Sequence, residues 1–410
     1  MPTTGIQEEI HVERVIEVRG HIIRDNILKQ IDASVEQYNG RYRVLQLSVG
    51  DQVDDESVAK VALDLPDDKI DLILNELINL GCTIPRGDET ITIKLAEKDK
   101  TVPDDFYSTT NHATEVFLNG KWVRAKYQRM DACLVVKGDE VHCVKLRDIK
   151  KGDQVICGSN GVRLVLPQTE EHGAEFSFMS NEVSSERRVE VIVKKLAEEM
   201  RQIRERNGRI VFVAGPVVIH TGGQEAFMSL IRKGYVNALL SGNALAVHDI
   251  ERALFGTSLG VNLDTGSVVR GGHKNHMRAI NAINRSGSIA EAVADGTLKS
   301  GIMYECVKHN VPFVLAGSIR DDGPLPDTLM DLIEAQAQYA EQVADADLVI
   351  MLSTMLHAIG TGNMMPSWIK TVCVDINPAV VTKLMDRGSA QTVGVVTDVG
   401  LFLTMLEKDL

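Results

Sequence analysis

Residues 344–375 read ADADLVIMLSTMLHAIGTGNMMPSWIKTVCVD, and the rest of the chain can be organised around them. Leu348–Leu352 is an apolar run of strand length that ends at a polar pair, Ser353 and Thr354. Thr371–Val374 is a second such run, and Asp375 closes it. Two buried strands joined by a crossover are typical of a parallel sheet. The stretch therefore predicts a βαβ unit.

The polar residues at the two strand ends indicate a dinucleotide site. Asp375 lies roughly 20 residues beyond the first turn, where a carboxylate in such units accepts hydrogen bonds from the adenosine ribose. Backbone N–H groups from Thr354 through Met355 and Leu356 to His357 are placed to hold the pyrophosphate, because a helix start has unpaired donors. No G-x-G-x-x-G follows the first strand. The alternative is an ordinary βαβ unit in which Asp375 caps the next turn.

The composition bounds the kind of protein. A chain of 410 residues, 44% of them hydrophobic, is long enough for two or three domains with substantial cores. The net charge of −13 argues against nucleic acid or an anionic membrane as a partner. No apolar run reaches about 18 residues, and the N-terminus MPTTGIQEEI lacks the features of a signal peptide, so we expect a soluble, cytoplasmic protein.

The cysteines and histidines give no sign of a metal site. The six cysteines are scattered without a C-x-x-C pair, which indicates reduced core thiols rather than a zinc site or a disulfide framework. The segment from Gly271 to His276 places His273 and His276 three residues apart, but no carboxylate or cysteine ligand stands nearby. We therefore expect no metal, and His273 is better suited to carry a proton.

Residues 1–97 are expected to form a ferredoxin-like α+β domain. The patterns predict a strand over 10–23, a helix capped by Asp25 or Asn26, two alternating strands and a second helix that ends at Gly81. A last strand over Thr90–Leu95 completes the order β-α-β-β-α-β. This fold alone assigns no function.

Residues 98–181 are expected to form a small β-domain that contributes substrate loops. Short β-prone runs alternate there with turn signals, which are Asn119-Gly120, Gly138-Asp139, Lys151-Gly152-Asp153 and Asn160-Gly161. The loops Phe106–His112 and Gln128–Asp131 are rich in hydrogen-bonding side chains. Either can reach a polar substrate, although such loops more often form plain surface.

Residues 182–410 are expected to form a Rossmann-like parallel sheet with helices. Five buried strands, each ending in a small or polar turn, are predicted over 209–214, 235–240, 311–316, 348–352 and 371–374. In a doubly wound sheet these turns meet at the carboxyl edge, where ligands bind. Asn243 and Ala244 occupy one turn, where the Asn caps a helix or bonds a cofactor amide. Arg320, Asp321 and Asp322 occupy another, which suits a zwitterionic substrate or the nicotinamide ribose, or an internal salt bridge.

Long segments resemble one known family. The segments are VAGPVVIHTGG, LLSGNALAVHDIE, LKSGIMYECVKHNVPFVLAGSIRDDGPLPD, VIMLSTMLHAIGTGNMMPSWIKTVCVDINPAVVTKLMDRGS and VGVVTDVG, with FYSTTNH and the Asp131 region. They are similar to the archaeal-type ornithine cyclodeaminases, which carry the lysine-oxoglutarate reductase/saccharopine dehydrogenase conserved region. A similar module forms the C-terminal part of the cyanobacterial arginine-degrading enzymes. The nucleotide half is also similar to the deoxyhypusine-synthase type of fold, which would explain the missing glycine fingerprint.

This resemblance implies NAD as cofactor and names further contacts. The implied NAD contacts are Asn243, Ala244, Asp322, Thr354 to His357, Asp375, Asp398 and Val399. Those at Asp322 and Asp398 rest mainly on the resemblance. An acid at Asp375 would repel a 2′-phosphate, so NAD is preferred to NADP.

The implied reaction converts L-ornithine to L-proline and ammonia without net oxidation. Bound NAD⁺ takes hydride from the α-carbon and returns it after the δ-amine has closed the ring and ammonia has left. The site must bind a carboxylate, deprotonate an amine and exclude water. The candidates are Arg320 or Lys274 for the carboxylate, Asp131 or Asp321 for the amines, and His112 or His273 for proton transfer.

Two rival functions remain open. An NAD-linked amino-acid or opine dehydrogenase would release reduced cofactor, whereas a non-catalytic NAD- or amino-acid-sensing protein would bind without turnover. Length and the polar strand ends favour an enzyme. Exposed edges of the ferredoxin-like domain predict a homo-oligomer.

Overall fold

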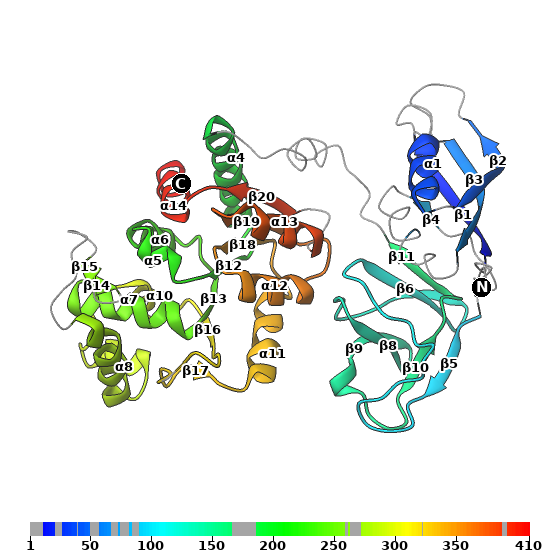
Figure 1. Cartoon of the computed structure of the whole chain (residues 1–410). Helices are drawn as coiled ribbons and strands as arrows, with labels where there is room; N and C mark the ends of the chain where they lie inside the picture. Colours follow the sequence, from blue (N-terminus) through cyan, green and yellow to red (C-terminus); the bar gives the residue numbers. More distant parts are fainter. Residues whose placement is uncertain are drawn as a thin grey trace, which may run out of the picture. The chain divides into compact units, whose positions relative to one another are not determined.

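The structure is a computed structural model, and it describes most of the chain. The described residues are 11–20, 27–38, 40–49, 57–66, 73, 82–83, 90–165, 186–258, 261–262, 272–321, 323–387 and 392–410. They fall into two compact units, which are described separately (Figure 1). Unit 1 comprises residues 1–108, 113–126 and 133–167, and unit 2 comprises residues 109–112, 127–132 and 168–410.

The first sheet of unit 1 has the strand order of the predicted ferredoxin-like fold. Its elements are β1 (His11–Gly20), α1 (Ile27–Gln37), β2 (Arg41–Ser48), β3 (Ser57–Pro66) and β4 (Cys82–Thr83). The strand order is β2-β3-β1-β4 with antiparallel neighbours. Alternate residues of β3 fill the core against α1, since Ala59, Val61, Leu63 and Leu65 are fully buried. The predicted second helix lies outside the described residues, apart from Ile73.

The prediction that Thr90–Leu95 completes this first sheet is wrong. The strand there, β5 (Thr92–Leu95), pairs with β10 (Gln154–Cys157) in another sheet, and the short β4 takes the fourth place beside β1. An alternating strand can pair wherever a partner edge is free, so its sequence pattern does not name its sheet. The division of the chain at 97/98 and 181/182 stays a prediction.

The remaining strands of unit 1 form two small antiparallel sheets, as the turn signals predicted. Their orders are β5-β10-β8-β9 and β11-β6-β7. The strands are β6 (Ala113–Leu118), β7 (Lys121–Arg124), β8 (Ala132–Lys137), β9 (Glu140–Lys145), β10 and β11 (Val162–Val165), with the 3₁₀ turn η2 (Leu146–Asp148). Asn119 and Gly120 both have positive φ, 53° and 79°, which is the backbone that a two-residue hairpin turn requires.

Unit 2 is built on a seven-stranded parallel sheet of order β17-β16-β13-β12-β18-β19-β20. The strands are β12 (Ile210–Ala214), β13 (Ala238–Gly242), β16 (Phe313–Ala316), β17 (Thr328–Leu329), β18 (Leu348–Leu352), β19 (Lys370–Asp375) and β20 (Thr392–Val396). The predicted Rossmann-like sheet is confirmed. The chain builds outward from β12, first through β13 to β17 and then through β18 to β20 on the other side, so the order reverses between β12 and β18.

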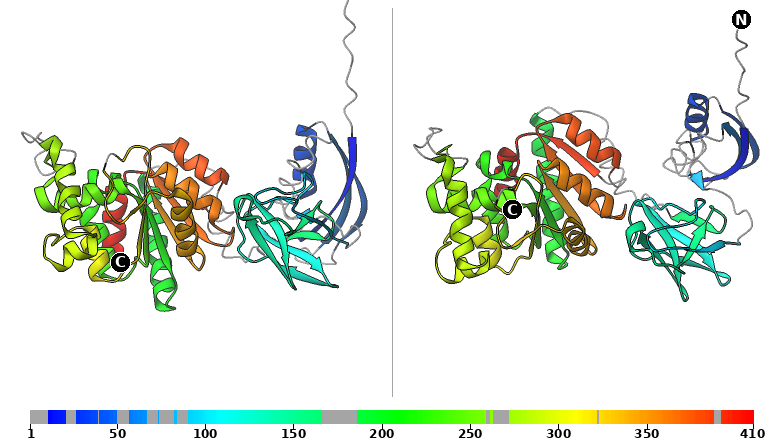
Figure 2. Two further views of the ribbon diagram at one scale, coloured as in Figure 1. Left: turned by 90° about the horizontal axis from the view of Figure 1, so that it is seen from below. Right: turned by 60° about the horizontal axis from the view of Figure 1, so that its bottom comes forward.

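Helices cover both faces of this sheet (Figure 2). One layer contains α4 (Glu186–Glu205), α5 (Val217–His220), α6 (Gln224–Arg232), α7 (Asn243–Phe255), α8 (Asn275–Ser286), α9 (Ile289–Ala294), α10 (Ile302–Lys308) and α14 (Val399–Asp409). The other contains α11 (Leu332–Val343), α12 (Met355–Met364) and α13 (Pro378–Arg387). The short elements β14 (Thr257–Ser258), β15 (Val261–Asn262) and η3 (Gly272–Lys274) lie between α7 and α8 in sequence.

Both faces of the central strands are apolar because both are covered. Ile210, Phe212 and Ala214 of β12 belong to one core cluster, while Val211 and Val213 belong to the other. Burial on both faces explains why these strands read as continuous apolar runs rather than as alternating ones. None of the helices in the described ranges is long and apolar enough to cross a membrane. Cys133, Cys143, Cys157, Cys306 and Cys373 are buried free thiols, as predicted.

Candidate functional site

The turns after β12 and β18 meet where the strand order reverses. A Cβ atom built on Gly215 would lie 2.5 Å from the carbonyl oxygen of Ser353 and 3.0 Å from Cβ of Thr354. Ser353 itself has a φ of 42°, which is unusual for a residue other than glycine. The two backbones are thus in direct contact at the carboxyl edge, the position at which doubly wound sheets bind dinucleotides.

Asp375 lies beside this contact, at the end of β19. Its Oδ2 accepts a 3.1 Å hydrogen bond from Ser353 Oγ, and its Oδ1 accepts a 2.8 Å bond from the N–H of Asn377. The residue is 8% exposed. The turn-capping alternative is therefore present in the structure. Since each carboxylate oxygen can accept two hydrogen bonds, capacity for ribose hydroxyls remains, and that role stays a prediction.

The start of α12 offers free backbone donors at the same edge. Thr354 is the N-cap residue, but its side chain does not cap the helix. Its Oγ1 instead lies 2.9 Å from Nδ1 of His357. Met355 and Leu356 are exposed in the first turn. The arrangement fits an anionic group such as a pyrophosphate.

His357 extends from α12 to the end of β13. A Cβ atom on Gly242 would lie 2.8 Å from Cε1 and 3.0 Å from Nε2 of the ring, so Gly242 makes room for the histidine. The ring centroid lies 6.3 Å from that of Tyr339, whose hydroxyl donates to the carbonyl of Ser241. Burial lowers the pKa of His357, and the charge of Asp321 opposes that shift. The imidazole is therefore held near two other strand ends.

Asn243 holds the loop that follows β16. Its Oδ1 accepts from the N–H of Leu325 at 3.1 Å and from Oγ1 of Thr328 at 2.9 Å. Its Nδ2 donates to Oδ1 of Asp321 at 3.3 Å. The side chain does not cap α7, because Gly242 is the N-cap residue there. Asn243 thus fixes the position of Asp321, and any contact with a cofactor stays a prediction.

The other predicted residues of the carboxyl edge surround this group. Ala244 and Arg320 are exposed, and Asp398 caps α14 by accepting from the N–H of Leu401 at 2.9 Å. Val399 is buried behind it. Asp322 lies outside the described residues.

The loops that carry His112 and Asp131 contact the C-terminal end of α12 and the turn before β19, away from the carboxyl edge. The N–H of Ser367 donates to the carbonyl of Asn111 at 2.8 Å, and that of Met130 donates to the carbonyl of Asn363. Asn363 is in the last turn of α12, roughly 14 Å from Thr354 along the axis at 1.5 Å per residue. Burial lowers the pKa of His112.

The structure therefore does not bring His112 and Asp131 to the carboxyl edge of their own chain. Their predicted catalytic roles stay predictions.

His273 and Lys274 are exposed in η3, at the start of α8. A Cβ atom on Gly323 would lie 3.7 Å from Cε of Met277, so the first turn of α8 neighbours the loop after β16. The structure thus brings the helix that follows His273 next to the loop that carries Arg320 and Asp321. In the described part of the chain, no group of three His, Cys, Asp or Glu side chains is placed to hold a metal ion.

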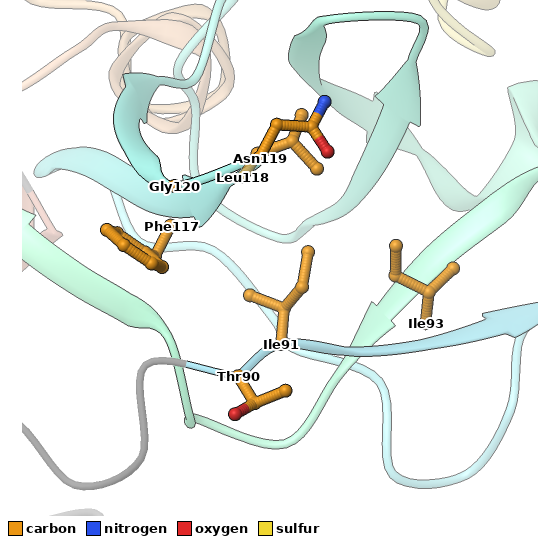
Figure 3. A pocket seen from close by; sticks show the side chains of 7 residues that line it. All are labelled: Thr90, Ile91, Ile93, Phe117, Leu118, Asn119 and Gly120. Atoms are coloured by element: carbon orange, nitrogen blue, oxygen red, sulfur yellow. The ribbon is translucent and has the colours of Figure 1, made fainter.

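A cavity of about 380 Å³ in unit 1 is not a candidate catalytic site (Figure 3). Its lining residues are Thr90, Ile91, Ile93, Phe117, Leu118, Asn119 and Gly120. None of these carries a titratable side chain, so the cavity lacks groups for acid–base chemistry.

The hydrogen bond of the Ser353 side chain is a feature of the site that the strand-end pattern alone did not predict. A small polar residue directly after an apolar run, 22 residues before an acid at the next strand end, is the signal that indicates this pairing.

Three family models cover the chain. "Arginine dihydrolase ArgZ-like, C-terminal, Rossmann fold" matches residues 194–406, and the "first region" of the same C-terminal part matches residues 113–193. "LOR/SDH bifunctional enzyme conserved region" matches residues 13–112.

Similar proteins extend the comparison. The ornithine cyclodeaminase of Methanocaldococcus jannaschii is 52% identical, over 97% of this chain and 96% of that protein. The bifunctional arginine dihydrolase/ornithine cyclodeaminase AgrE of Nostoc is 48% identical, and the chain spans 60% of its length.

Two solved structures are similar along the whole chain. The apo structure of the cyanobacterial arginine dihydrolase ArgZ has a TM-score of 0.85 at 46% identity, covering 100% of this chain and 60% of that one. The ternary complex of AgrE with ornithine and NAD⁺ has a TM-score of 0.54 at 47% identity, covering 99% and 59%. The chain therefore belongs to the enzyme family that contains the archaeal ornithine cyclodeaminases and the C-terminal part of the ArgZ-like arginine dihydrolases.

Proposed function

We propose that this protein is an NAD-dependent ornithine cyclodeaminase, which converts L-ornithine to L-proline and ammonia. The observation that carries the proposal is the carboxyl edge around Gly215, Ser353 and Asp375, which combines a close backbone approach, a buried acceptor and an uncapped helix start. The names of the archaeal relatives and the complex of AgrE with ornithine and NAD⁺ support it.

The described residues fit NAD at this edge. Asp375 would accept from the adenosine ribose, and the N–H groups of the first turn of α12 would bind the pyrophosphate. The negative charge of Asp375 disfavours a 2′-phosphate, so NAD is preferred to NADP. When bound, NAD⁺ supplies a hydride acceptor that returns the hydride to the same carbon.

The residues of the chain bind the substrate, move its protons and exclude water. Arg320 is an exposed cation suited to the α-carboxylate, and Asp321, held by Asn243 and by the N–H of Ser318, suits an ammonium group. The proton-transfer roles of His112, His273 and Asp131 remain predictions, as do Lys274 as an alternative carboxylate ligand, a homo-oligomeric state and a cytoplasmic location.

A product assay tests the proposal. Purified protein is incubated with L-ornithine and NAD⁺, and proline, ammonia and NADH absorbance are followed together. Proline and ammonia without net NADH are expected. Steady NADH formation would indicate a dehydrogenase, and no product from ornithine or other diamino acids, despite binding, would indicate a sensing protein.

A further inference from the structure

Two histidines and a buried acid form a second group of titratable side chains in unit 2. Ser258 Oγ lies 3.0 Å from Nδ1 of His220, and the ring of His220 packs against that of His248 at a centroid distance of 5.1 Å. Nδ1 of His248 lies 3.4 Å from Oε2 of Glu251. These four side chains are called the His220 cluster below.

The His220 cluster runs from the surface into the core. His220 is exposed, His248 is partly buried, and Glu251 is completely buried. Oε1 of Glu251 accepts a 2.8 Å bond from Thr257 Oγ1, which in turn accepts from Asn275. The cluster thereby joins α5, α7 and β14, which pack together, and its inner end reaches the start of α8 (Figure 1).

The cluster lies on the half of the sheet that the reacting end of the cofactor should reach. α5 begins two residues after Gly215, and α7 begins at the end of β13. A dinucleotide in this fold crosses the point where the strand order reverses. If its adenosine ribose binds Asp375 beyond β18, its other end lies over β12 and β13. His220 is on that side.

We infer that His220 is a catalytic base that exchanges protons with the amino groups of a diamino acid substrate, and that His248 and Glu251 position its ring. The inference rests on the proposed function, to which it adds a proton-transfer residue. The buried carboxylate orients His248, and the ring of His248 limits the orientations open to His220.

The chemistry balances without any further reactant. In the tautomer that carries a proton on Nδ1, His220 donates to Ser258 Oγ and leaves the lone pair of Nε2 free. With the α-amine uncharged, hydride leaves the α-carbon and an α-iminium group forms. Nε2 accepts a proton from the δ-ammonium group, and the neutral δ-amine adds to the carbon of this iminium. Nε2 then passes the proton to the α-nitrogen and takes one from the ring nitrogen, so ammonia departs as the C=N bond of the ring forms. The ring nitrogen regains that proton once hydride has returned to the α-carbon.

The charge environment agrees with a base. Although His220 reaches the surface, the partial burial of its ring lowers its pKa, and the neighbouring His248 lowers it further, while Glu251 opposes the shift. An uncharged imidazole at neutral pH can accept a proton.

The test compares His220→Asn with His309→Asn in the full-length protein. Asparagine keeps a polar atom near the position of Nδ1 but has nothing at Nε2. His309 is an exposed histidine that pairs with Glu305 on α10, so it is a matched surface control. His220→Asn should lower the rate of proline formation by about 10²- to 10⁴-fold with unchanged affinity for NAD⁺, and His309→Asn should leave the rate unchanged.

A second measurement does not depend on turnover. In NADH-bound protein labelled with ¹³C at histidine Cε1, the resonance that disappears in His220→Asn should shift on addition of L-ornithine but not of L-norvaline, which lacks the δ-amine. A resonance that ignores ornithine, or that responds equally to both, would overturn the inference. A loss of less than about twofold in the rate of His220→Asn would do the same.

The positioning role has its own readout. Glu251→Gln keeps an acceptor for Thr257 but loses the charge, and it should lower kcat while leaving KM for ornithine unchanged. If Glu251→Gln has the same kcat and KM as wild type, Glu251 does not position His220. If wild type forms no proline at all, the proposed function fails. The ¹³C resonance of His220 still reports whether this histidine contacts the δ-amine of bound L-ornithine.

Discussion

Ser353 Oγ donates a 3.1 Å hydrogen bond to Oδ2 of Asp375, across the gap between the ends of β18 and β19. The same serine has left-handed backbone geometry and touches Gly215. Ser353 thus links Asp375, the acid expected to bind ribose, to Gly215 in the turn after β12.

Replacing Asp375 tests the ribose assignment. Asp375→Ala should weaken NAD⁺ binding by roughly 1.5–3 kcal/mol, the usual value of hydrogen bonds to a charged acceptor. Isothermal titration calorimetry measures this directly. Asp375→Asn keeps one acceptor oxygen and should lose less. Unchanged affinity in Asp375→Ala, with an unchanged melting temperature, would show that the carboxylate only caps its own turn.

A methyl group at position 215 should separate the two turns. Gly215→Ala would place Cβ 2.5 Å from the carbonyl oxygen of Ser353, so the backbone must move, at a cost of about 1–3 kcal/mol in unfolding free energy. NAD⁺ affinity should fall as well. Gly360→Ala is the control, since no atom lies within 4 Å of the added Cβ in α12 and alanine favours the helix. Denaturant unfolding measures the stability of both variants. If Gly215→Ala were as stable as Gly360→Ala, the close contact between Gly215 and Ser353 would be contradicted.

Asn243 should control the order of the loop after β16. Asn243→Ala removes the acceptor of Leu325 N–H and Thr328 Oγ1 and the donor to Asp321, at a cost of about 1–3 kcal/mol. Hydrogen–deuterium exchange should accelerate within residues 318–328. KM for ornithine should rise if Asp321 binds an ammonium group. Exchange that stays at the wild-type rate would mean that other contacts hold the loop.

Asp249 should give the stability a measurable pH dependence. It is fully buried and accepts from the N–H groups of Ile302 and Met303 at the start of α10 and from Gln224. Burial raises its pKa to about 6 from 3.8. Because the folded state holds this proton more tightly than the unfolded state, stability falls as pH rises through that window, by about 3 kcal/mol in total.

The comparison of wild type with Asp249→Asn isolates this contribution. The unfolding free energy of wild type minus that of Asp249→Asn should fall by about 3 kcal/mol from about pH 4 to pH 6 and then stay constant. A constant difference across that range would place the pKa of Asp249 near its ordinary value in the folded protein.

The sheet of unit 2 could be predicted because its strands are buried on both faces. Leu348–Leu352 is apolar at every position, and Asp375 closes the next run, so strand positions and the polar edge follow from local sequence. The pairing of Thr92–Leu95 could not be predicted in this way. Its partner lies about sixty residues later in the chain, and a two-residue strand such as Cys82–Thr83 leaves no periodic pattern.

The position of Thr354, His357 and Asp375 at the carboxyl edge could be predicted from local sequence, because each follows an apolar strand. Their roles in binding NAD stay predictions. The neighbourhood of His220 and His248 arises only when α5 packs against α7, and the placement of His112 at the far end of α12 follows from the contacts of Asn111 with Ser367. Neither of these two contacts can be predicted from the spacing of the residues along the chain.

The bond from the N–H of Asn377 to Asp375 bears on engineering of cofactor preference. The donor is main chain, so it persists whatever side chains stand at 376 and 377. A library that exchanges Asp375 for shorter neutral acceptors can therefore keep the turn intact while removing the charge that is expected to repel a phosphorylated ribose. Gly215 and Ser353 should be left unvaried in such a library, because their contact determines how the turns after β12 and β18 pack beside position 375.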